Sequence, residues 1–230
     1  MHWKLDDLRK GVGKKRIGRR YSEFEESLSS FARRHNIASY HASEARGLLE
    51  KSLPKESIQR VIKLFGALLA PSDSESNKDV ALAYFYTEAH IYAYAQALHA
   101  ASDILAKVVW RALDLDVGWS KKKWVNLPTL LKEVQKGSDI HTSIDDLINN
   151  KPYGYLSAFT NQIKHHSVVP TSIPMQYWED SGEWVGLELS DFRYSGEYFP
   201  TKLLKEFVTD DFDAVSARYL AIIHGLIVAL

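Results

Sequence analysis

Residues Asn161 to His166, with the sequence Asn-Gln-Ile-Lys-His-His, hold the side chains best suited to chemistry in this 230-residue chain. They combine an amide, an ammonium and two imidazoles. An imidazole exchanges protons near neutral pH, and an ammonium attracts negatively charged groups. This combination indicates acid–base chemistry. In the alternative interpretation, Lys164, His165 and His166 only occupy the last turn of a helix, where the helix dipole favours cations.

A helix predicted over 154–167 would carry these residues near its C-terminal end. Its expected buried face consists of Leu156, Phe159 and Ile163. At about 100° per residue, Asn161 and His165 point away from that face, with Lys164 beside them. His166 falls at the edge of the buried face. We therefore expect one histidine to share an exposed surface with the amide and the ammonium, and the other to border the core.

The longest uninterrupted helical pattern covers 78–116, which contains neither glycine nor proline. Ser76 is its predicted N-cap and Gly118 its predicted end, which gives a helix of about 55–60 Å. Apolar residues recur every seven positions in two rows, Tyr84, Ile91, Leu98 and Leu105 in one, and Tyr94, Ala101, Val108 and Leu115 in the other. Because apolar side chains cover most of its circumference, this helix should pack on several sides. The pattern leaves open a bend near Ser102-Asp103.

The remaining elements are predicted to be shorter. One helix should begin at Ser22, where Ser22 and Glu25 match a capping box. Further predicted helices cover 42–53, 54–69, 127–136, 140–149 and 201–230, the last with a break near Asp210-Asp211. Alternating apolar residues on both sides of 180–182 predict a β-hairpin. The sequence thus predicts an all-α fold in one domain, 1–230: a helical bundle around a long central helix, with a small β-hairpin insertion near 172–190.

The bundle and the stretch 161–166 together resemble the HEPN superfamily over about 78–168. The motif of that family is Arg, four to six residues, then His. Asn161 and His166 have four residues between them, and Asn-x-x-Lys-His resembles a divergent branch that lacks the Arg. The motif is short, so the resemblance rests on the helical pattern as well.

The resemblance implies a homodimeric, metal-independent endoribonuclease in which the two motifs face each other. His166 would act as general acid or base for attack by a ribose 2′-OH, with His165 beside it. Asn161 stands where the family has an Arg that holds the phosphate, and Lys164 could supply only a point charge. Because other members bind RNA or partner proteins without cleaving them, a non-catalytic RNA-binding or protein-interaction module is the alternative.

A second candidate for RNA contact is the basic, glycine-containing segment 9–20, which we expect to be flexible. Its proposed phosphate contacts are Lys14, Lys15, Arg16, Arg19 and Arg20. The alternative is a solvated, mobile arm without a ligand. Three aromatic residues of the predicted hairpin, Tyr177, Trp178 and Trp184, are more simply explained by cross-strand pairing than by base stacking.

Composition narrows the remaining possibilities. The formal net charge is zero, so RNA binding would depend on a local patch. The absence of cysteine excludes disulfides and Cys-ligated metals and is compatible with the cytoplasm, which is the compartment we expect. The apolar run 219–230 is shorter than the ~20 residues needed to span a bilayer, so we expect a buried core helix and no membrane contact. No metal or other cofactor is expected, since no ligand motif is present.

Overall fold

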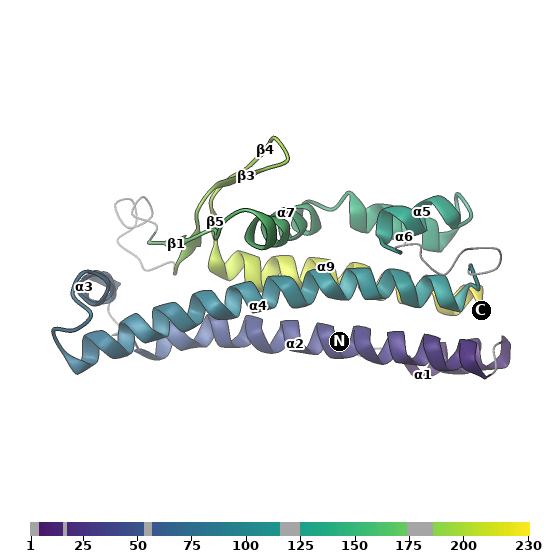
Figure 1. Cartoon of the computed structure of the whole chain (residues 1–230), viewed down its shortest axis with the longest axis horizontal. Helices are drawn as coiled ribbons and strands as arrows, with labels where there is room; N and C mark the ends of the chain where they lie inside the picture. Colours follow the sequence, from purple (N-terminus) through teal and green to yellow (C-terminus); the bar gives the residue numbers. More distant parts are fainter. Residues whose placement is uncertain (1–4, 16–17, 53–56, 116–124, 174–185) are drawn as a thin grey trace. The chain divides into compact units, whose positions relative to one another are not determined.

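The computed structural model describes residues 5–15, 18–52, 57–115, 125–173 and 186–230 (Figure 1). These residues form long helices and a few short antiparallel strands, which confirms the predicted helical fold with a small β insertion. The chain divides into two compact units. Unit 1 comprises Met1–Ile37, Ala97–Leu156 and Asp213–Leu230, and unit 2 comprises Ala38–Gln96 and Ser157–Phe212. A single folding domain over 1–230 stays a prediction.

The predicted long helix is α4, which extends without a break from Glu75 to Ala112 and contributes to both units. Its N-cap is Ser74 and not the predicted Ser76, because Ser74 Oγ accepts a hydrogen bond from Asn77 N at 3.1 Å. The helix continues through Ser102-Asp103, so no break occurs there. It ends four residues earlier than predicted, in a turn where Asp114 has a φ of +59°. The predicted end at Gly118 lies outside the described residues.

The two helices predicted on either side of residues 32–41 are one helix, α2 (Arg19–Ser52). Nothing in the intervening sequence ends a helix, since it lacks glycine and proline. The predicted capping box is also wrong. Ser22 lies inside α2, and its N–H donates to Gly18 O at 3.1 Å. Gly18, with a φ of +60°, marks the boundary instead, because a left-handed backbone favours glycine.

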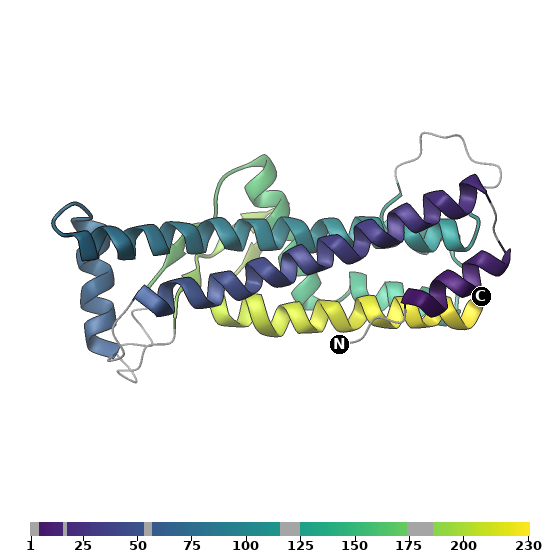
Figure 2. The same ribbon diagram turned by 90° about the horizontal axis from the view of Figure 1, so that it is seen from below.

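The segment predicted to be flexible is helical over its described residues except for the turn at Gly18. Its first part belongs to α1 (Leu5–Lys15), where Leu8 and Val12, one turn apart, are fully buried. A Cβ at Gly11 would lie 3.2 Å from Leu230 Cβ, so glycine lets α1 approach the C-terminal residue of unit 1 closely (Figure 2). The burial of this small apolar face explains why two internal glycines do not prevent the helix.

Unit 1 contains α1, parts of α2, α4 and α7 (Lys151–His165), and three further elements. These are α5 (Leu127–Glu133), α6 (Asp139–Ile148) and most of α9 (Asp211–Ala229). Asn126 caps α5 by accepting from Thr129 N at 2.9 Å, and Ser138 caps α6 by accepting from His141 N at 3.2 Å. In the core, the fully buried Tyr219 donates its hydroxyl to Leu98 O at 2.8 Å.

The end of the chain differs at its start from the helical region predicted over 201–230. It begins with strand β5 (Lys202–Leu203) and continues through a π-helical segment, η1 (Glu206–Asp210), before α9. The change from π to α geometry coincides with the predicted break at Asp210-Asp211. Among the described residues, the helical stretch Glu206–Ala229 is long and apolar enough to cross a membrane, a length and composition that it shares with the core helices of soluble proteins.

Unit 2 contains α3 (Ser57–Leu69), parts of α2, α4 and α7, and the strands. β1 (Thr171–Ser172), β2 (Glu188–Leu189) and β5 form one antiparallel sheet in the order β1-β2-β5. The pairing of β1 with β2 confirms the base of the predicted hairpin, whereas its predicted turn and its three aromatic residues lie outside the described residues. A second hairpin, β3 (Phe192–Tyr194) with β4 (Glu197–Phe199), was not predicted.

Candidate functional site

The stretch 161–166 forms the C-terminal end of α7, which begins three residues earlier than predicted and ends at His165. Two of the three residues expected on its inner face, Leu156 and Phe159, are buried, and Ile163 is half-buried. Lys164, His165 and His166 are all exposed. The expectation that His166 borders the core is therefore wrong. The helical wheel does not predict the direction of this side chain, because α7 has ended before His166 and the chain turns there.

His166 contacts an aromatic ring from another element. Its ring centroid lies 5.9 Å from that of Tyr194 in β3, in an edge-to-face arrangement. Its backbone N–H donates to Gln162 O at 2.9 Å, which closes the last turn of α7. Within the part of the chain that the structure describes, the side chains of Lys164 and His165 form neither hydrogen bonds nor ion pairs. An ammonium and two imidazoles are thus presented together to solvent, with a phenol ring beside them.

The hairpin β3–β4 positions Tyr194 through its apolar face. Phe192 packs edge-on against Phe159 of α7 at 6.1 Å and stacks on Phe199 at 4.9 Å. Side chains alternate between the two faces of a strand, so Arg193 and Tyr198 lie on the opposite, exposed face. The Arg193 guanidinium carbon is 5.6 Å from the centroid of the Tyr198 ring, which is a cation–π distance.

The tip of this hairpin contains the signal that sequence analysis missed. Ser195 and Gly196 both have positive φ, +51° and +85°, as a two-residue type I′ turn requires. A Ser-Gly pair between short aromatic stretches is a weak form of the hairpin pattern. Strands of three residues are too short to produce a clear alternation of apolar and polar residues.

The chain that follows α7 is held to α4 by a polar network within unit 2. Glu88 Oε1 accepts from Thr171 N at 3.0 Å and from Thr171 Oγ1 at 2.9 Å. Tyr84 donates its hydroxyl to Thr171 O at 2.8 Å, and Tyr92 donates to Val169 O at 3.2 Å. Burial raises the pKa of Tyr92 to about 12, so its phenol stays protonated and keeps donating. The network fixes the path of the chain three to five residues beyond His166.

The predicted basic contacts lie in unit 1, whereas the stretch 161–166 lies in unit 2. Among the described members, Arg19 and Arg20 are paired with carboxylates. Arg19 Nε lies 2.8 Å from Glu23 Oε1, and Arg20 Nη1 lies 2.9 Å from Asp114 Oδ2. Lys14 and Lys15 are exposed on α1, and Arg16 lies outside the described residues. Since ion pairing reduces the charge offered to a phosphate, this group is a weaker anion site than its sequence indicates.

Two other clusters contain side chains that could take part in acid–base or nucleophilic chemistry. In unit 2, His41 of α2 and His90 of α4 place their Nδ1 atoms 2.7 Å apart, with ring centroids 4.9 Å apart. This is the geometry of one shared N–H···N hydrogen bond. Burial and the neighbouring His90 lower the pKa of His41. No group of three His, Asp or Glu side chains that could hold a metal ion occurs among the described residues.

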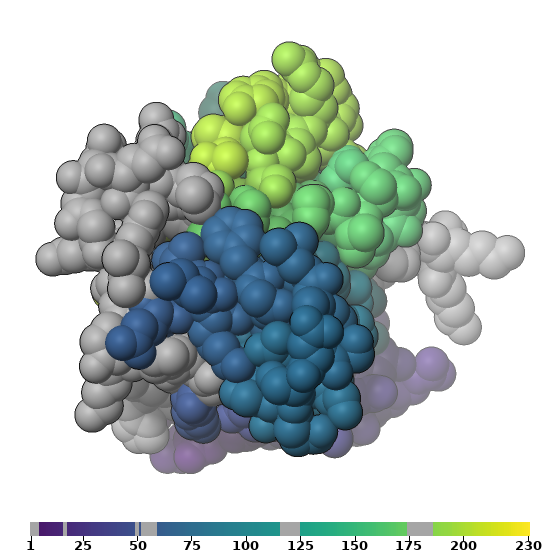
Figure 3. All heavy atoms as spheres, turned by 90° about the vertical axis from the view of Figure 1, so that its left-hand side faces the viewer, coloured from purple at the N-terminus to yellow at the C-terminus, as the bar shows by residue number. Residues whose placement is uncertain are grey.

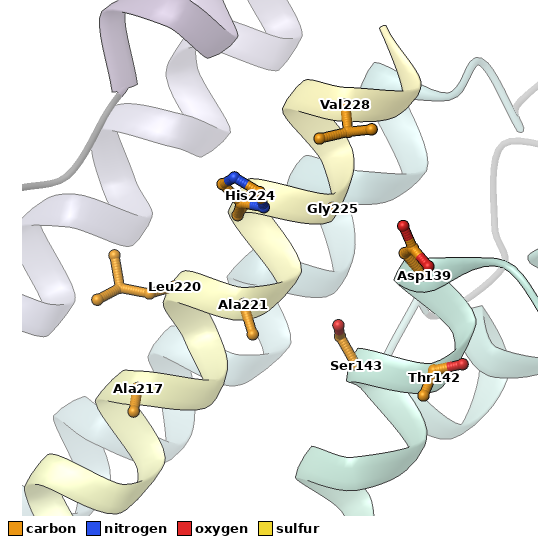
Figure 4. Close-up of a pocket in the computed structure, with 9 residues that line it drawn as sticks. All are labelled: Asp139, Thr142, Ser143, Ala217, Leu220, Ala221, His224, Gly225 and Val228. Carbon is orange, nitrogen blue, oxygen red and sulfur yellow. The ribbon is translucent and has the colours of Figure 1, made fainter.

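A groove in unit 1 lies between α6 and α9 and has a volume of about 540 Å³ (Figure 4). Asp139, Thr142 and Ser143 line the α6 side, and α9 contributes small and apolar residues together with His224. Within the described residues, no hydrogen bond links His224 to Ser143 or Asp139, so the groove does not contain an activated serine.

Comparisons with protein-family models, with curated protein sequences and with solved structures gave no match to this chain. The exposed end of α7 and the hairpin beside it therefore have to be interpreted from their own chemistry.

Proposed function

We propose that this protein acts on RNA as an HEPN-like, metal-independent endoribonuclease, with the end of α7 as its site. The observation that carries the proposal is the joint exposure of Lys164, His165 and His166, with the Tyr194 ring against His166. The proposal also includes a homodimer, because the resemblance implies that two copies of the motif act together.

These groups match what RNA cleavage without a metal requires. A base takes the proton of the ribose 2′-OH, whose oxygen attacks the adjacent phosphorus. An acid gives a proton to the departing 5′-oxygen, which leaves a 2′,3′-cyclic phosphate and a 5′-OH end. His166 and His165 would fill these two roles. Lys164 would stabilise the negative charge that develops on the phosphate, and Asn161 would donate a hydrogen bond to it.

The hairpin supports RNA as the ligand. Unpaired bases stack on exposed aromatic rings, and arginine guanidinium groups add cation–π contacts and phosphate contacts. Tyr198 is 56% exposed and lies under Arg193, while Tyr194 lies beside the proposed acid–base group. A single strand passing over the end of α7 would find rings and cations within a few residues of one another.

A non-catalytic RNA-binding or protein-interaction module is the second candidate, and Asn161 favours it. An amide at this position cannot provide the two parallel charged hydrogen bonds of an arginine. Lys164 is the one cation of the stretch besides its histidines. Such a surface would bind a phosphate backbone more readily than it would stabilise a transition state.

The test is cleavage of a broad panel of fluorescent RNAs in the presence of EDTA. We expect wild type to cleave and His166→Ala to be inactive with unchanged helicity. His224→Ala, which removes another exposed histidine, is the matched control and should cleave like wild type. If wild type cleaves none of the panel, the enzymatic proposal fails. If Lys164→Ala also leaves RNA binding unchanged, RNA is not the ligand of this surface.

Five basic residues of the segment 9–20, Lys14, Lys15, Arg16, Arg19 and Arg20, are a subsidiary part of the proposal. Exposed lysines would add to affinity without selecting a sequence. Replacing Lys14 and Lys15 by Ala should therefore reduce the salt dependence of RNA binding and leave the cleavage pattern unchanged. An unchanged salt dependence would remove this segment from the RNA-binding surface.

A further inference from the structure

One face of α4 in unit 2 is apolar yet exposed. Leu82, Phe85 and Tyr86 are 49%, 61% and 50% exposed, and Ala89 continues the same face at the spacing i, i+3, i+4, i+7. Figure 3 shows the first turns of α4 beside α3, in blue, at the surface of this unit. Exposed contiguous apolar surface of this kind marks an interaction site more often than a free surface.

The other faces of this part of α4 are occupied. Val80, Ala83, Thr87 and Ile91 are buried. Tyr84, Glu88 and Tyr92 bind the chain around Thr171 through their hydroxyl and carboxylate groups. The face with Leu82, Phe85 and Tyr86 is what remains, so its apolar side chains are not needed to pack the described part of unit 2.

His90 of α4, beside this face, makes a ring contact with α2. The ring centroids of Phe85 and Tyr86 lie 5.9 Å apart. His90 follows one helical turn after Tyr86. His90 contacts Tyr40 of α2 at 6.1 Å, and Tyr40 is 57% exposed. We use the name aromatic ridge for the set Tyr40, Leu82, Phe85, Tyr86, Ala89 and His90.

The aromatic ridge is almost free of charge. Between Asp79 and Gln96, Glu88 is the one acidic residue of α4, and this stretch contains neither lysine nor arginine. Its carboxylate points to Thr171, on another face of the helix. A surface that meets its own copy brings like charges together unless it carries none. The aromatic ridge is therefore suited to a second copy of itself.

We propose that two copies of this chain associate through their aromatic ridges, with the two α4 helices antiparallel around a two-fold axis midway between Tyr86 and Ala89. In a parallel pair, Glu75 would face Glu75 and Asp79 would face Asp79. In an antiparallel pair about this axis, Asp79 faces Gln96 of the partner and Glu75 faces Ala100, and neither of these partner residues is charged. Opposed helix dipoles favour the same arrangement.

The available area is adequate for a weak to moderate dimer. Each copy exposes four large side chains on the aromatic ridge, with roughly 100 Å² of exposed surface apiece: Tyr40, Leu82, Phe85 and Tyr86. Contact between two copies would therefore bury about 800 Å² in total. Specific interfaces begin near about 1,200 Å², so the surrounding side chains have to supply about a third. This association does not depend on RNA cleavage. It adds a surface to the homodimer that the proposed function expects.

The first experiment measures the mass of the full chain by light scattering and sedimentation over a range of concentrations. The monomer is 26.2 kDa, and we expect a species of twice that mass. Leu82→Glu with Phe85→Glu should raise the dissociation constant at least tenfold, since four carboxylates would meet across the axis. Val228→Glu, at an equally exposed apolar residue of unit 1, is the control and should leave the dimer intact.

The second experiment uses the absence of cysteine in the natural chain. A mixture of the Tyr86→Cys and Ala89→Cys proteins should form a mixed disulfide under mild oxidation. A mixture of the Leu82→Cys and Ala93→Cys proteins should form a mixed dimer in preference to either like pair. Preferential pairing of Leu82→Cys with itself would overturn the antiparallel arrangement.

Two results would overturn the proposal itself. One is a monomer of 26.2 kDa at every concentration up to about 100 μM, where even a weak specific dimer would be populated. The other is a dimer that the double glutamate variant does not weaken. Because all of these measurements are made without RNA, they are independent of whether His166 cleaves it.

Discussion

In unit 1, His35 is 7% exposed and its Nε2 lies 2.8 Å from Ser216 Oγ, between the rings of Phe31 and Tyr219. In unit 2, His166 is exposed at the end of α7, with one ring against its edge. A buried imidazole with a hydroxyl partner contributes packing and a hydrogen bond, whereas an exposed one can reach a ligand. The difference indicates that histidine content alone does not identify a site. The surroundings of each histidine distinguish His35, which has a structural role, from His166, the candidate catalytic residue.

The largest effect on stability should come from the buried residue. His35→Ala removes a ring from the core and leaves the buried Ser216 hydroxyl without this partner, which should cost about 3 kcal/mol. His166→Ala should change the free energy of unfolding by less than about 0.5 kcal/mol. Urea denaturation of the two variants measures both values. Equal losses would mean that the contrast between the two histidines is false.

The same contrast should appear as a pH dependence. Burial lowers the pKa of His35 from its usual 6.5 to about 4. Above pH 6.5 the His35 imidazole is neutral in both the folded and the unfolded chain, so its contribution to the free energy of unfolding is complete. As the pH falls from 6.5 toward 4, the unfolded chain binds the proton first, so stability is lost by up to about 3 kcal/mol.

The measurement is the free energy of unfolding at pH 7.5 and at pH 4.5 for wild type and for His35→Gln. The variant lacks this titration, so its stability should fall less between the two pH values. A His35→Gln profile parallel to that of wild type would show that another group causes the acid sensitivity.

How far the sequence predicts this fold depends on the range over which each signal acts. The seven-residue rows of α4 are a local pattern repeated many times, so the long helix is predicted correctly, with errors only at its ends. The continuity of α2 was missed because a polar stretch between two apolar faces resembles a connector. The residues from Ala32 to His41 nevertheless contain nothing that ends a helix.

The candidate site is predictable only in part. The sequence places Lys164, His165 and His166 at the end of a helix, and the structure agrees. The contact between His166 and Tyr194 joins residues 28 positions apart, and it depends on Phe192 packing against Phe159. A helical wheel contains no information on such a contact, because the second element reaches the site through tertiary packing.

A smaller effect is expected where a buried network supports the exposed site. Thr171→Val keeps the shape of the side chain but removes the hydroxyl that donates to Glu88 at 2.9 Å. The loss should be about 1–2 kcal/mol, because Glu88 keeps its bond from Thr171 N. Urea denaturation measures the loss. If Thr171 positions the chain after α7, the variant should also weaken RNA binding. The control is Thr160→Val, which removes another buried hydroxyl, one that donates to Ala95 O at 3.3 Å, and should leave RNA binding unchanged.

The smallest effect is expected at an exposed ion pair of unit 1. Arg20 Nη1 donates to Asp114 at 3.0 Å and 2.9 Å, but its side chain is 61% exposed. Water and salt screen such a pair, so Arg20→Ala should cost about 0.5 kcal/mol or less, and the cost should vanish near 1 M NaCl. Denaturation at low and high salt measures both. A loss of several kcal/mol that persists in salt would mean that exposure is a poor guide to energetic weight, and the contrast between His35 and His166 would lose its basis. A small, salt-sensitive loss would extend that contrast from imidazoles to ion pairs. In both cases, burial of the partners would then decide how much a polar contact contributes to the free energy of unfolding.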